Sequence, residues 1–383
     1  MRRRHGVCVV FLATAAVLTA CLLTEGPRPA HAFVLRPPMA LFPSSPLQRV
    51  PQKEQELATR RFATTSNPAP PPAAAAATAA APAGPEKAKA RVILKGLQAD
   101  RFRHPLDQQV TEQLRMIPGL EWVVRRVMTV LEEAVYLDNI SSAILVGPTQ
   151  MPSLHASLVE AASILDLPLL PELYIKQSPV PNAYCMAIQG RRPFIVMHTS
   201  LIDLLTPAEI QVVLAHELTH IKCEHGVFIT AANALAMGLY SVGGSLGRIL
   251  GDRLSNMLFA WLRAAELSCD RGALLVAQDL DVVLSALLKL VGGSQSLNGQ
   301  LSTEAFLQQA RSYDQAGGRG LGRFLRQQLE VGLTHPLPVL RVRELERWYN
   351  SEMYGGIVGR GVLMKEEEGG KEDEMEKEAV VGV

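Results

Sequence analysis

Cysteine is scarce in this chain, which has five among 383 residues. Two of the five, Cys8 and Cys21, lie in an N-terminal stretch that we expect to be removed. The other three, Cys185, Cys223 and Cys269, are an odd number and provide no disulfide framework, so the fold must depend on a hydrophobic core. We interpret these three as small core residues, with a redox or metal-binding role as the alternative.

An excess of one charge is lacking as well. Lys and Arg number 38 against 37 Asp and Glu, so the formal net charge is only +1. Because there is no basic patch, nothing in the sequence indicates binding to nucleic acid. Charge is uneven at the C-terminus, where residues 356–383 end in an acidic, Gly-interrupted run, and we predict that this segment is a disordered tail.

Residues 1–32 resemble a targeting sequence. They begin with the basic Met1–Arg4, continue with an apolar stretch from Val7 to Leu23, and end in the small-residue pattern Ala30-His31-Ala32. This order is typical of a secretory signal peptide with its cleavage site, so we predict a signal peptide here rather than a membrane anchor.

Residues 33–90 have few acids, and residues 67–85 consist mainly of Pro and Ala. This composition predicts a transit-peptide-like segment followed by a disordered linker. A signal peptide followed by such a segment resembles the bipartite targeting of algae with complex plastids. We therefore expect a plastid location, with the secretory pathway or another membrane as the alternative.

The most informative stretch is His216-Glu217-Leu218-Thr219-His220, which reads H-E-x-x-H inside an apolar helical pattern. Residues four apart on an α-helix project from the same face, so His216 and His220 can reach one metal ion. Glu217 would lie beside that ion, where it can take a proton from a water molecule. Two surface histidines without a metal are the alternative.

The helix that carries this motif has a well-marked beginning. Thr206 is a good N-cap, Pro207 suits the first helical position, and Glu209 follows three residues after the cap. Apolar residues then recur at helical spacing, and we predict that the helix runs to about His225-Gly226. We interpret His225 itself as a core or capping residue.

A catalytic zinc ion needs a third protein ligand besides two histidines. Glu266 and Asp270, one turn apart in a second long apolar helical segment, are the candidates. Glu266 can bind the metal, and Asp270 can hold the ring of a ligand histidine from its far side. A buried acid needs a partner, and a metal with its histidines supplies one. An ordinary surface acid pair is the alternative.

Several further stretches, spread over about residues 95–350, carry a family resemblance. With the metal motif and Lys222-Cys223 they are Phe102–Asp107, Pro181–Tyr184, His198–Leu201, Leu205–Gln211, Glu266–Arg271, Ala273–Asp279 and Thr334–Arg341. Together they resemble the HtpX/CAAX-prenyl-protease type of zinc metallopeptidases, which are gluzincins, and within them the plastoglobule-located plastid branch and its cyanobacterial relatives. Thr219 stands where many relatives have Gly.

This resemblance implies hydrolysis of peptide bonds in proteins or peptides, with one zinc ion per subunit. The two histidines of the motif and Glu266 would hold the zinc, and Glu217 would act as general base. By analogy with the His-Pro motif of the family, His335 would donate a hydrogen bond to the developing oxyanion. Arg341 would order the site by pairing with an acid.

A peptide substrate would bind along a strand. In the family an Asn-Ala-Tyr/Phe stretch forms the edge of a sheet, and an extended peptide pairs with it as an added strand. Here this stretch is Asn182, Ala183 and Tyr184. Backbone pairing selects side chains weakly, so we expect a broad peptidase. A hairpin of the core sheet is the alternative.

Residues 227–265 link the metal motif to Glu266 and include an uncharged apolar stretch from Val227 to Gly247. A single membrane crossing would place ligands of one metal on opposite sides of the bilayer. The segment must therefore return, and we predict a helical hairpin. It either dips into a lipid monolayer or packs as ordinary core.

Residues 91–355 are long enough for one zinc metallopeptidase domain with its own core. Helical patterns predominate, and β-rich runs such as 173–175 and 194–197 are short. We therefore predict an α+β fold, a mostly helical zincin-like domain with one small antiparallel sheet. The functional alternatives are a non-hydrolytic scaffold protein that contains a metal and a redox-sensing protein working through Cys223 and Cys269.

Overall fold

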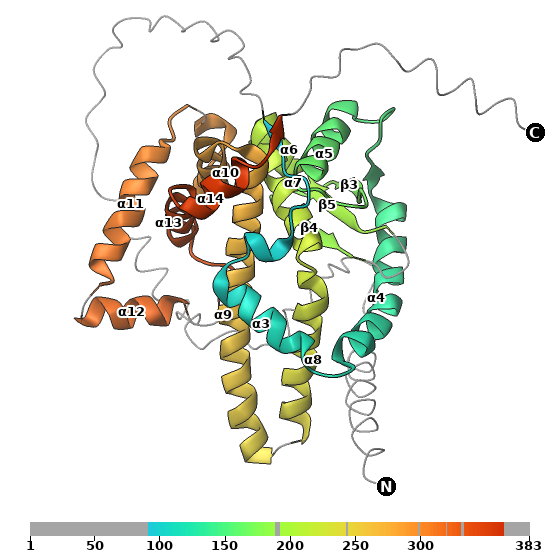
Figure 1. Cartoon of the computed structure of the whole chain (residues 1–383), viewed down its shortest axis with the longest axis vertical. Coiled ribbons are helices and arrows are strands. Elements are labelled where there is room, and N and C mark those ends of the chain that lie inside the picture. Colours follow the sequence, from blue (N-terminus) through green and yellow to red (C-terminus); the bar gives the residue numbers. More distant parts are fainter. Residues whose placement is uncertain are drawn as a thin grey trace, which may run out of the picture. The chain divides into compact units, whose positions relative to one another are not determined.

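The computed structural model describes residues 91–363, except 188–191, 243, 298, 319 and 331–332. The described residues belong to one compact unit, in which helices predominate around a small sheet (Figure 1). This arrangement confirms the predicted α+β, mostly helical class. The predicted signal peptide, the linker and most of the acidic tail lie outside the described residues.

The main sheet has four strands, β2 (Ile144–Leu145), β3 (Glu172–Lys176), β5 (Phe194–His198) and β4 (Ala183–Met186), in that order. The expectation of one antiparallel sheet is wrong for its central pair, because β3 and β5 run parallel. β4 follows β3 in sequence but lies on the far side of β5, to which it is antiparallel. β5 is thereby inserted between them, and its residues 194–197 are buried.

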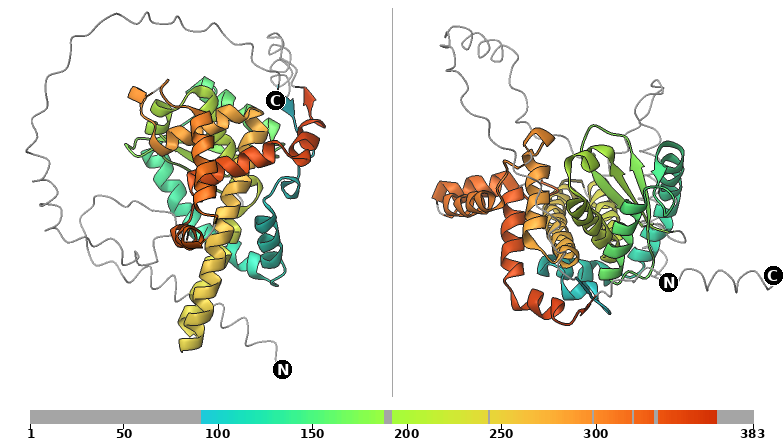
Figure 2. Two further views of the ribbon diagram at one scale, coloured as in Figure 1. Left: turned by 90° about the vertical axis from the view of Figure 1, so that its left-hand side faces the viewer. Right: turned by 90° about the horizontal axis from the view of Figure 1, so that it is seen from above.

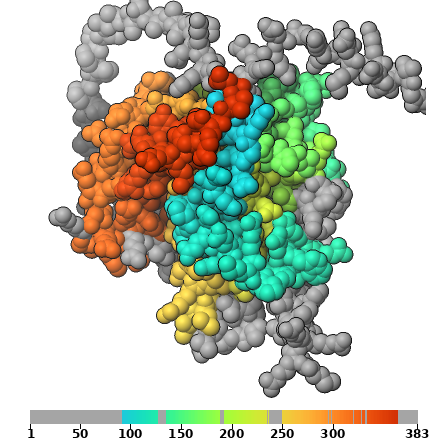
Figure 3. All heavy atoms as spheres, in the orientation of Figure 1, coloured from blue at the N-terminus to red at the C-terminus, as the bar shows by residue number. Residues whose placement is uncertain are grey.

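A second, two-stranded sheet joins the ends of the described chain. β1 (Val92–Ile93) pairs with β6 (Val362–Leu363), which follows α14 (Glu352–Val358). In the space-filling view β1, in blue, and β6, in red, lie side by side (Figure 3). The folded domain therefore continues to Leu363, past the boundary expected at residue 355, because the last strand needs the first as its partner.

α7 (Pro207–Lys222) is the central helix. It packs against β4 and against α5 (Pro152–Ile164), α9 (Gly244–Ala277) and α10 (Leu280–Gly292). Its beginning is the predicted one, since Thr206 Oγ1 accepts from Glu209 N (3.4 Å) and Glu209 Oε2 accepts from Thr206 N (2.7 Å). These two hydrogen bonds satisfy amides that the first turn of a helix leaves without partners.

α7 ends earlier than its sequence pattern predicts. Glu224 adopts a left-handed backbone (φ 54°) after the C-cap Cys223, and His225 begins the next helix, α8 (His225–Val242). Arg103 donates to the carbonyl of Cys223 (2.6 Å). The expected end at about His225 is wrong because this contact from a distant part of the chain is not visible in the local pattern.

The other helices are α3 (Pro105–Arg115), α4 (Leu120–Ser142), α6 (Thr199–Leu204), α11 (Thr303–Ala316), α12 (Gly320–Glu330) and α13 (Pro338–Tyr349), with 3₁₀ turns at Ala99–Arg101 and Gln295–Leu297. α3 and α4 are separate because Gly119 adopts φ 79° between them. α3 lies alongside α9 and α8, so a segment from the start of the domain reaches the helices that follow the metal motif.

α8 and α9 form the predicted helical hairpin, which projects from the body of the domain (Figures 1 and 2). Among the residues that the structure describes, no helix is both long and apolar enough to cross a membrane. Ile249, Leu250 and Met257 of α9 are exposed, whereas Trp261 is fully buried. The outer half of α9 thus presents apolar side chains, and its inner half belongs to the core.

α7 and α9 approach each other closely at one glycine. A Cβ atom built on Gly272 of α9 would lie 2.0 Å from Oγ1 of Thr219 on α7. Thr219 cannot easily turn away, because its hydroxyl donates to the carbonyl of Ala215 (2.7 Å). The absence of a side chain at Gly272 therefore allows the contact that brings the metal motif next to α9.

Candidate active site

The packing of α7 against α9 brings His216, His220 and Glu266 into one cluster. Nε2 of His216 lies 3.4 Å from Oε2 of Glu266, and Nε2 of His220 lies 3.5 Å from Oε1 of the same carboxylate. Tetrahedral zinc with bonds of about 2.0–2.1 Å separates its ligand atoms by roughly 3.3–3.4 Å. Each of the two nitrogen–oxygen distances is close to this value, and two imidazole nitrogens with one carboxylate suit zinc in chemistry.

Asp270 holds the ring of His216 from behind. Its Oδ1 lies 3.2 Å from Nδ1 of His216, and Arg341 donates to both carboxylate oxygens (2.8 and 2.5 Å). Burial would raise the pKa of Asp270, but Arg341 and His216 hold this pKa below its usual value. An ionised Asp270 accepts a hydrogen bond from Nδ1 of His216, so Nε2 is the nitrogen that faces Glu266 and is available to a metal ion that replaces its proton.

The charges of the cluster favour a cation. Burial would lower the pKa of His216, but hydrogen bonds to Asp270 and Glu266 raise it to about 10. Burial would likewise raise the pKa of Glu266, yet the histidines around it hold this pKa well below its usual range. A metal ion that binds here replaces a proton, so the affinity for metal should fall as the pH falls.

His220 is backed by another histidine. Its Nδ1 lies 3.0 Å from Nδ1 of His225, whose Nε2 lies 3.0 Å from Oδ2 of Asp107. His225 is buried, as expected for a core residue, but the contact with His220 was missed by the sequence reasoning. The signal was weak, because five residues on one continuous helix would place the two rings far apart around its axis. Only the break after α7 brings them together.

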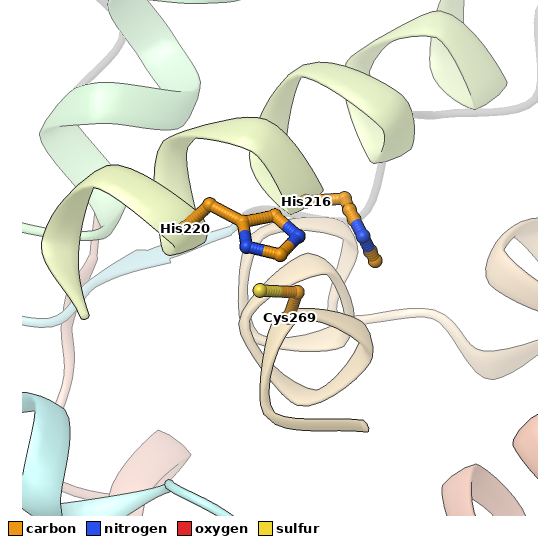
Figure 4. Close-up of side chains that lie close together, drawn as sticks. All are labelled: His216, His220 and Cys269. Carbon is orange, nitrogen blue, oxygen red and sulfur yellow. The ribbon is translucent and has the colours of Figure 1, made fainter. Parts of the chain in front are cut away.

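Cys269 also lies beside the histidines, as Figure 4 shows. It offers a sulfur atom within 4.8 Å of nitrogens of His216 and His220, so it competes with Glu266 as a third ligand. Glu266 has the better position, since each of its oxygens faces an Nε2 atom. The sulfur of Cys269 lies 3.6 Å from Nδ1 of His225, on the opposite side of the His220 ring, and burial raises the pKa of its thiol.

Glu217 is buried beside the cluster, with 8% of its surface exposed. β4 packs against α7, and the pKa of the Cys185 thiol on β4 is raised, mainly by burial and further by the nearby Glu217 carboxylate. Cys185 is therefore more than a core residue, since it lies near the carboxylate predicted to act as general base. No spacing in the sequence relates Cys185 to Glu217, because they meet only through the packing of β4 on α7.

β4 is an edge strand. Ala183 and Tyr184 open it, and they pair with Met197 and Val196 of β5 on one side. Among the described residues, no strand pairs with its other side. Asn182 precedes the strand, and its carbonyl accepts from His198 N (3.0 Å). Two of the three residues predicted to bind substrate thus lie on a strand that packs against α7 and has an open edge, and Asn182 directly precedes it.

His335 stands at the outer side of the cluster. Its Nδ1 lies 3.0 Å from Oε2 of Glu266, and its side chain is 65% exposed. The hydrogen bond to Glu266 raises the pKa of His335, which favours a protonated ring that can donate hydrogen bonds. The structure therefore brings together all the residues predicted for the metal cluster and its surroundings.

Residues 148–349, more than half of the chain, match the description Peptidase family M48. The chain belongs to peptidase family M48. It is 50% identical over 275 residues to the plastoglobule-localized metallopeptidase 48, chloroplastic, of Arabidopsis thaliana, which covers 72% of this chain and 79% of the relative. Membership in this family makes the chain a protease, and proteases of this family depend on a metal.

More distant relatives of this M48 peptidase share a shorter segment. The protease HtpX homolog 2 of Methanosarcina mazei is 31% identical over 175 residues, which are 40% of this chain and 59% of the relative. The protease HtpX homolog of the organism Acaryochloris marina is 35% identical over 138 residues, 33% of this chain and 47% of the relative. The chain thus spans about half to three-fifths of these two relatives.

Proposed function

We propose that this M48 peptidase is a zinc-dependent endopeptidase in which His216, His220 and Glu266 hold one zinc ion. The observation that carries the proposal is the convergence of both Nε2 atoms on one buried carboxylate at 3.4 and 3.5 Å. Ligand atoms come from two helices that the close contact at Gly272 keeps together. The set of two histidines and one glutamate is typical of catalytic zinc sites in peptidases.

We assign a role in peptide hydrolysis to each residue around the cluster. Zinc, when bound, polarises a water molecule and the carbonyl of the scissile bond. Glu217 takes a proton from the attacking water and later delivers it to the leaving amine. His335, exposed beside Glu266, donates a hydrogen bond to the developing oxyanion. Asp270 and Arg341 keep the ring of His216 in place.

The open edge of β4 suits an extended peptide. Asn182, Ala183 and Tyr184 would offer their backbone groups to a substrate strand, as in other cases of strand addition. β4 packs against α7, the helix that carries Glu217, so a peptide bound along β4 would pass near the general base. Recognition by backbone hydrogen bonds predicts broad sequence preference in protein substrates.

Zinc content and casein hydrolysis of the full chain test the proposal together. We expect one zinc ion per chain, hydrolysis that stops when a chelator removes the metal, and recovery when zinc is returned. Recovery with zinc separates loss of the metal from unfolding of the protein, which circular dichroism follows in parallel. Hydrolysis that continues in metal-free protein would rule out the proposed chemistry.

We also propose that the enzyme acts in protein turnover in a plastid, at a lipid surface. The plastoglobule-localized relative and the predicted bipartite leader support this location. Ile249, Leu250 and Met257 on the hairpin, within residues 227–265, expose the apolar side chains that an interfacial helix needs.

Changing Ile249, Leu250 and Met257 to Gln should lower the fraction of protein that floats with lipid vesicles severalfold, because less apolar surface is buried in the lipid. A control variant in which the exposed Met353 and Leu363 are changed to Gln should float like the parent. Equal flotation of all three proteins would exclude a lipid role for the hairpin.

A further inference from the structure

The contact behind His220 continues into the core as a chain of hydrogen bonds. Nδ1 of His220 meets Nδ1 of His225 at 3.0 Å, and Nε2 of His225 meets Oδ2 of Asp107 at 3.0 Å. The side chains of His225 and Asp107 are 0% exposed, so water does not replace these contacts. Helices α7, α8 and α3 each contribute one member.

The other partners of Asp107 determine where the protons lie. Its Oδ1 accepts from Nε1 of Trp261 (3.0 Å), and its Oδ2 accepts from Oγ of Ser268 (2.7 Å). An indole N–H can only donate. Arg103 lies 3.9 Å from Oδ1 and contributes a positive charge. Asp107 is thus an ionised acceptor on both oxygens, and Nε2 of His225 must donate to it.

The proton position on His225 in turn determines the proton position on His220 in the metal cluster. A neutral imidazole that carries its proton on Nε2 has a lone pair on Nδ1. Nδ1 of His225 therefore accepts a hydrogen bond from the N–H of Nδ1 of His220. In a neutral His220 ring the lone pair is then on Nε2, the nitrogen that faces Glu266. The sulfur of Cys269, 3.6 Å from Nδ1 of His225, is a weak donor toward the same atom and agrees with this direction.

We infer that Asp107 and His225 are positioning residues that fix the tautomer of His220 for metal binding. The inference rests on the proposed zinc site and extends it to a buried relay that ends on a different helix. His216 receives its orientation from a carboxylate directly, whereas His220 receives it through a neutral ring. Groups behind a ligand histidine commonly change metal affinity by about 10–100-fold.

Asp107→Asn tests the hydrogen-bonded relay from Asp107 through His225 to His220, because the new amide nitrogen is a donor placed among groups that also donate to residue 107. If the amide nitrogen takes the place of Oδ1, it faces the N–H of Trp261, and neither group accepts. If the nitrogen takes the place of Oδ2, Ser268 can accept from it while donating to the carbonyl of Ala264, which lies 3.2 Å away. The second orientation is therefore preferred, and it moves the proton of His225 to Nδ1. His220 must then carry its own proton on Nε2, where zinc should bind.

The same substitution should be nearly harmless when Trp261 is Phe. Without the indole N–H, the new amide nitrogen can lie on the side of Oδ1 and donate to Thr111, whose Oγ1 is 3.3 Å from that oxygen. The carbonyl of the substituted side chain then accepts from His225 and restores the tautomer of the parent. Zinc binding favours this orientation of the amide, because only this orientation leaves Nε2 of His220 without a proton.

The measurement is zinc affinity, determined by competition with a chelator in the full chain. We expect Asp107→Asn to weaken zinc binding by about 10–100-fold in the parent background and by less than about threefold in the Trp261→Phe background. A merely structural role for Asp107 predicts an equal loss in both backgrounds, because the effects of two independent core changes add. An equal loss in both backgrounds, or no loss in either, overturns the inference.

Histidine ring NMR keeps the inference testable where a variant does not fold. In the unaltered full chain labelled with ¹⁵N-histidine, the ring nitrogens of His220 should show the proton on Nδ1, and zinc should shift the signal of Nε2. A proton on Nε2 in that ring overturns the relay. A parent chain that binds no zinc counts against the proposed function, whereas zinc binding with an additive mutant cycle counts against the relay alone.

Discussion

Replacing Glu217 with Gln is expected to lower kcat for casein hydrolysis by about 10²–10⁴-fold while zinc stays bound. The amide has the shape of the carboxylate but cannot take a proton from water. It also has nearly the same volume, so the buried surroundings of residue 217 stay filled. Because the metal is held by other side chains, its binding does not depend on the charge at this position.

The measurement combines steady-state hydrolysis with zinc content for the parent and the variant. Glu304→Gln is the matched control, because Glu304 is an exposed glutamate of α11 far from the motif in sequence. It should hydrolyse casein at the parental rate. If Glu217→Gln cleaves casein as fast as the parent, the general-base role is wrong. A parent that holds zinc and cleaves nothing would instead favour a metal-containing scaffold protein.

Gly272→Ala is expected to destabilise the fold by about 3 kcal/mol, the upper part of the usual range for an overpacked core. The added Cβ would lie 2.0 Å from Oγ1 of Thr219, and the hydroxyl is held by its hydrogen bond to Ala215. α7 and α9 must therefore separate. Their separation also moves the two histidines away from Glu266, so zinc affinity should fall with stability.

Chemical denaturation measures the free energy of unfolding of this variant. Gly355→Ala is the control, since nothing lies within 4 Å of a Cβ built on that helical glycine. It should match the parent or exceed it by up to about 1 kcal/mol. Combining Gly272→Ala with Thr219→Gly should recover part of the loss, because the glycine removes the atoms that clash. A double variant less stable than Gly272→Ala would show that the clash is not the cause.

Local chemistry made the helix that carries the H-E-x-x-H motif predictable from sequence. Thr206, Pro207 and Glu209 form the expected start of α7, since a capping box involves only neighbours in sequence. The pairing of the H-E-x-x-H motif with Glu266 was accessible for a different reason. Zinc needs a third ligand, and few acids lie in apolar helical segments. Glu266 was therefore predicted from the number of ligands that zinc requires and not from a local sequence pattern.

What the sequence could not predict depends on partners far apart in the chain. His225 and Asp107 are 118 residues apart, and no periodicity relates them. The parallel pairing of β3 and β5 likewise depends on where β4 lies, which short β-rich runs do not specify. At the early end of α7, the carbonyl of Cys223 accepts from Arg103, more than a hundred residues before it. In each case a tertiary contact overrides or completes a local preference.

α9 is continuous from Gly244 to Ala277, so the tip of the hairpin and Glu266 belong to one stiff rod. At about 1.5 Å per residue, Ile249 lies roughly 25 Å along the axis from Glu266. A membrane or protein surface that binds the tip would therefore also displace the carboxylate of Glu266, which lies near the imidazoles of His216 and His220. Tilting α9 by a few degrees at its tip would change the distances between Glu266 and the two histidines of α7.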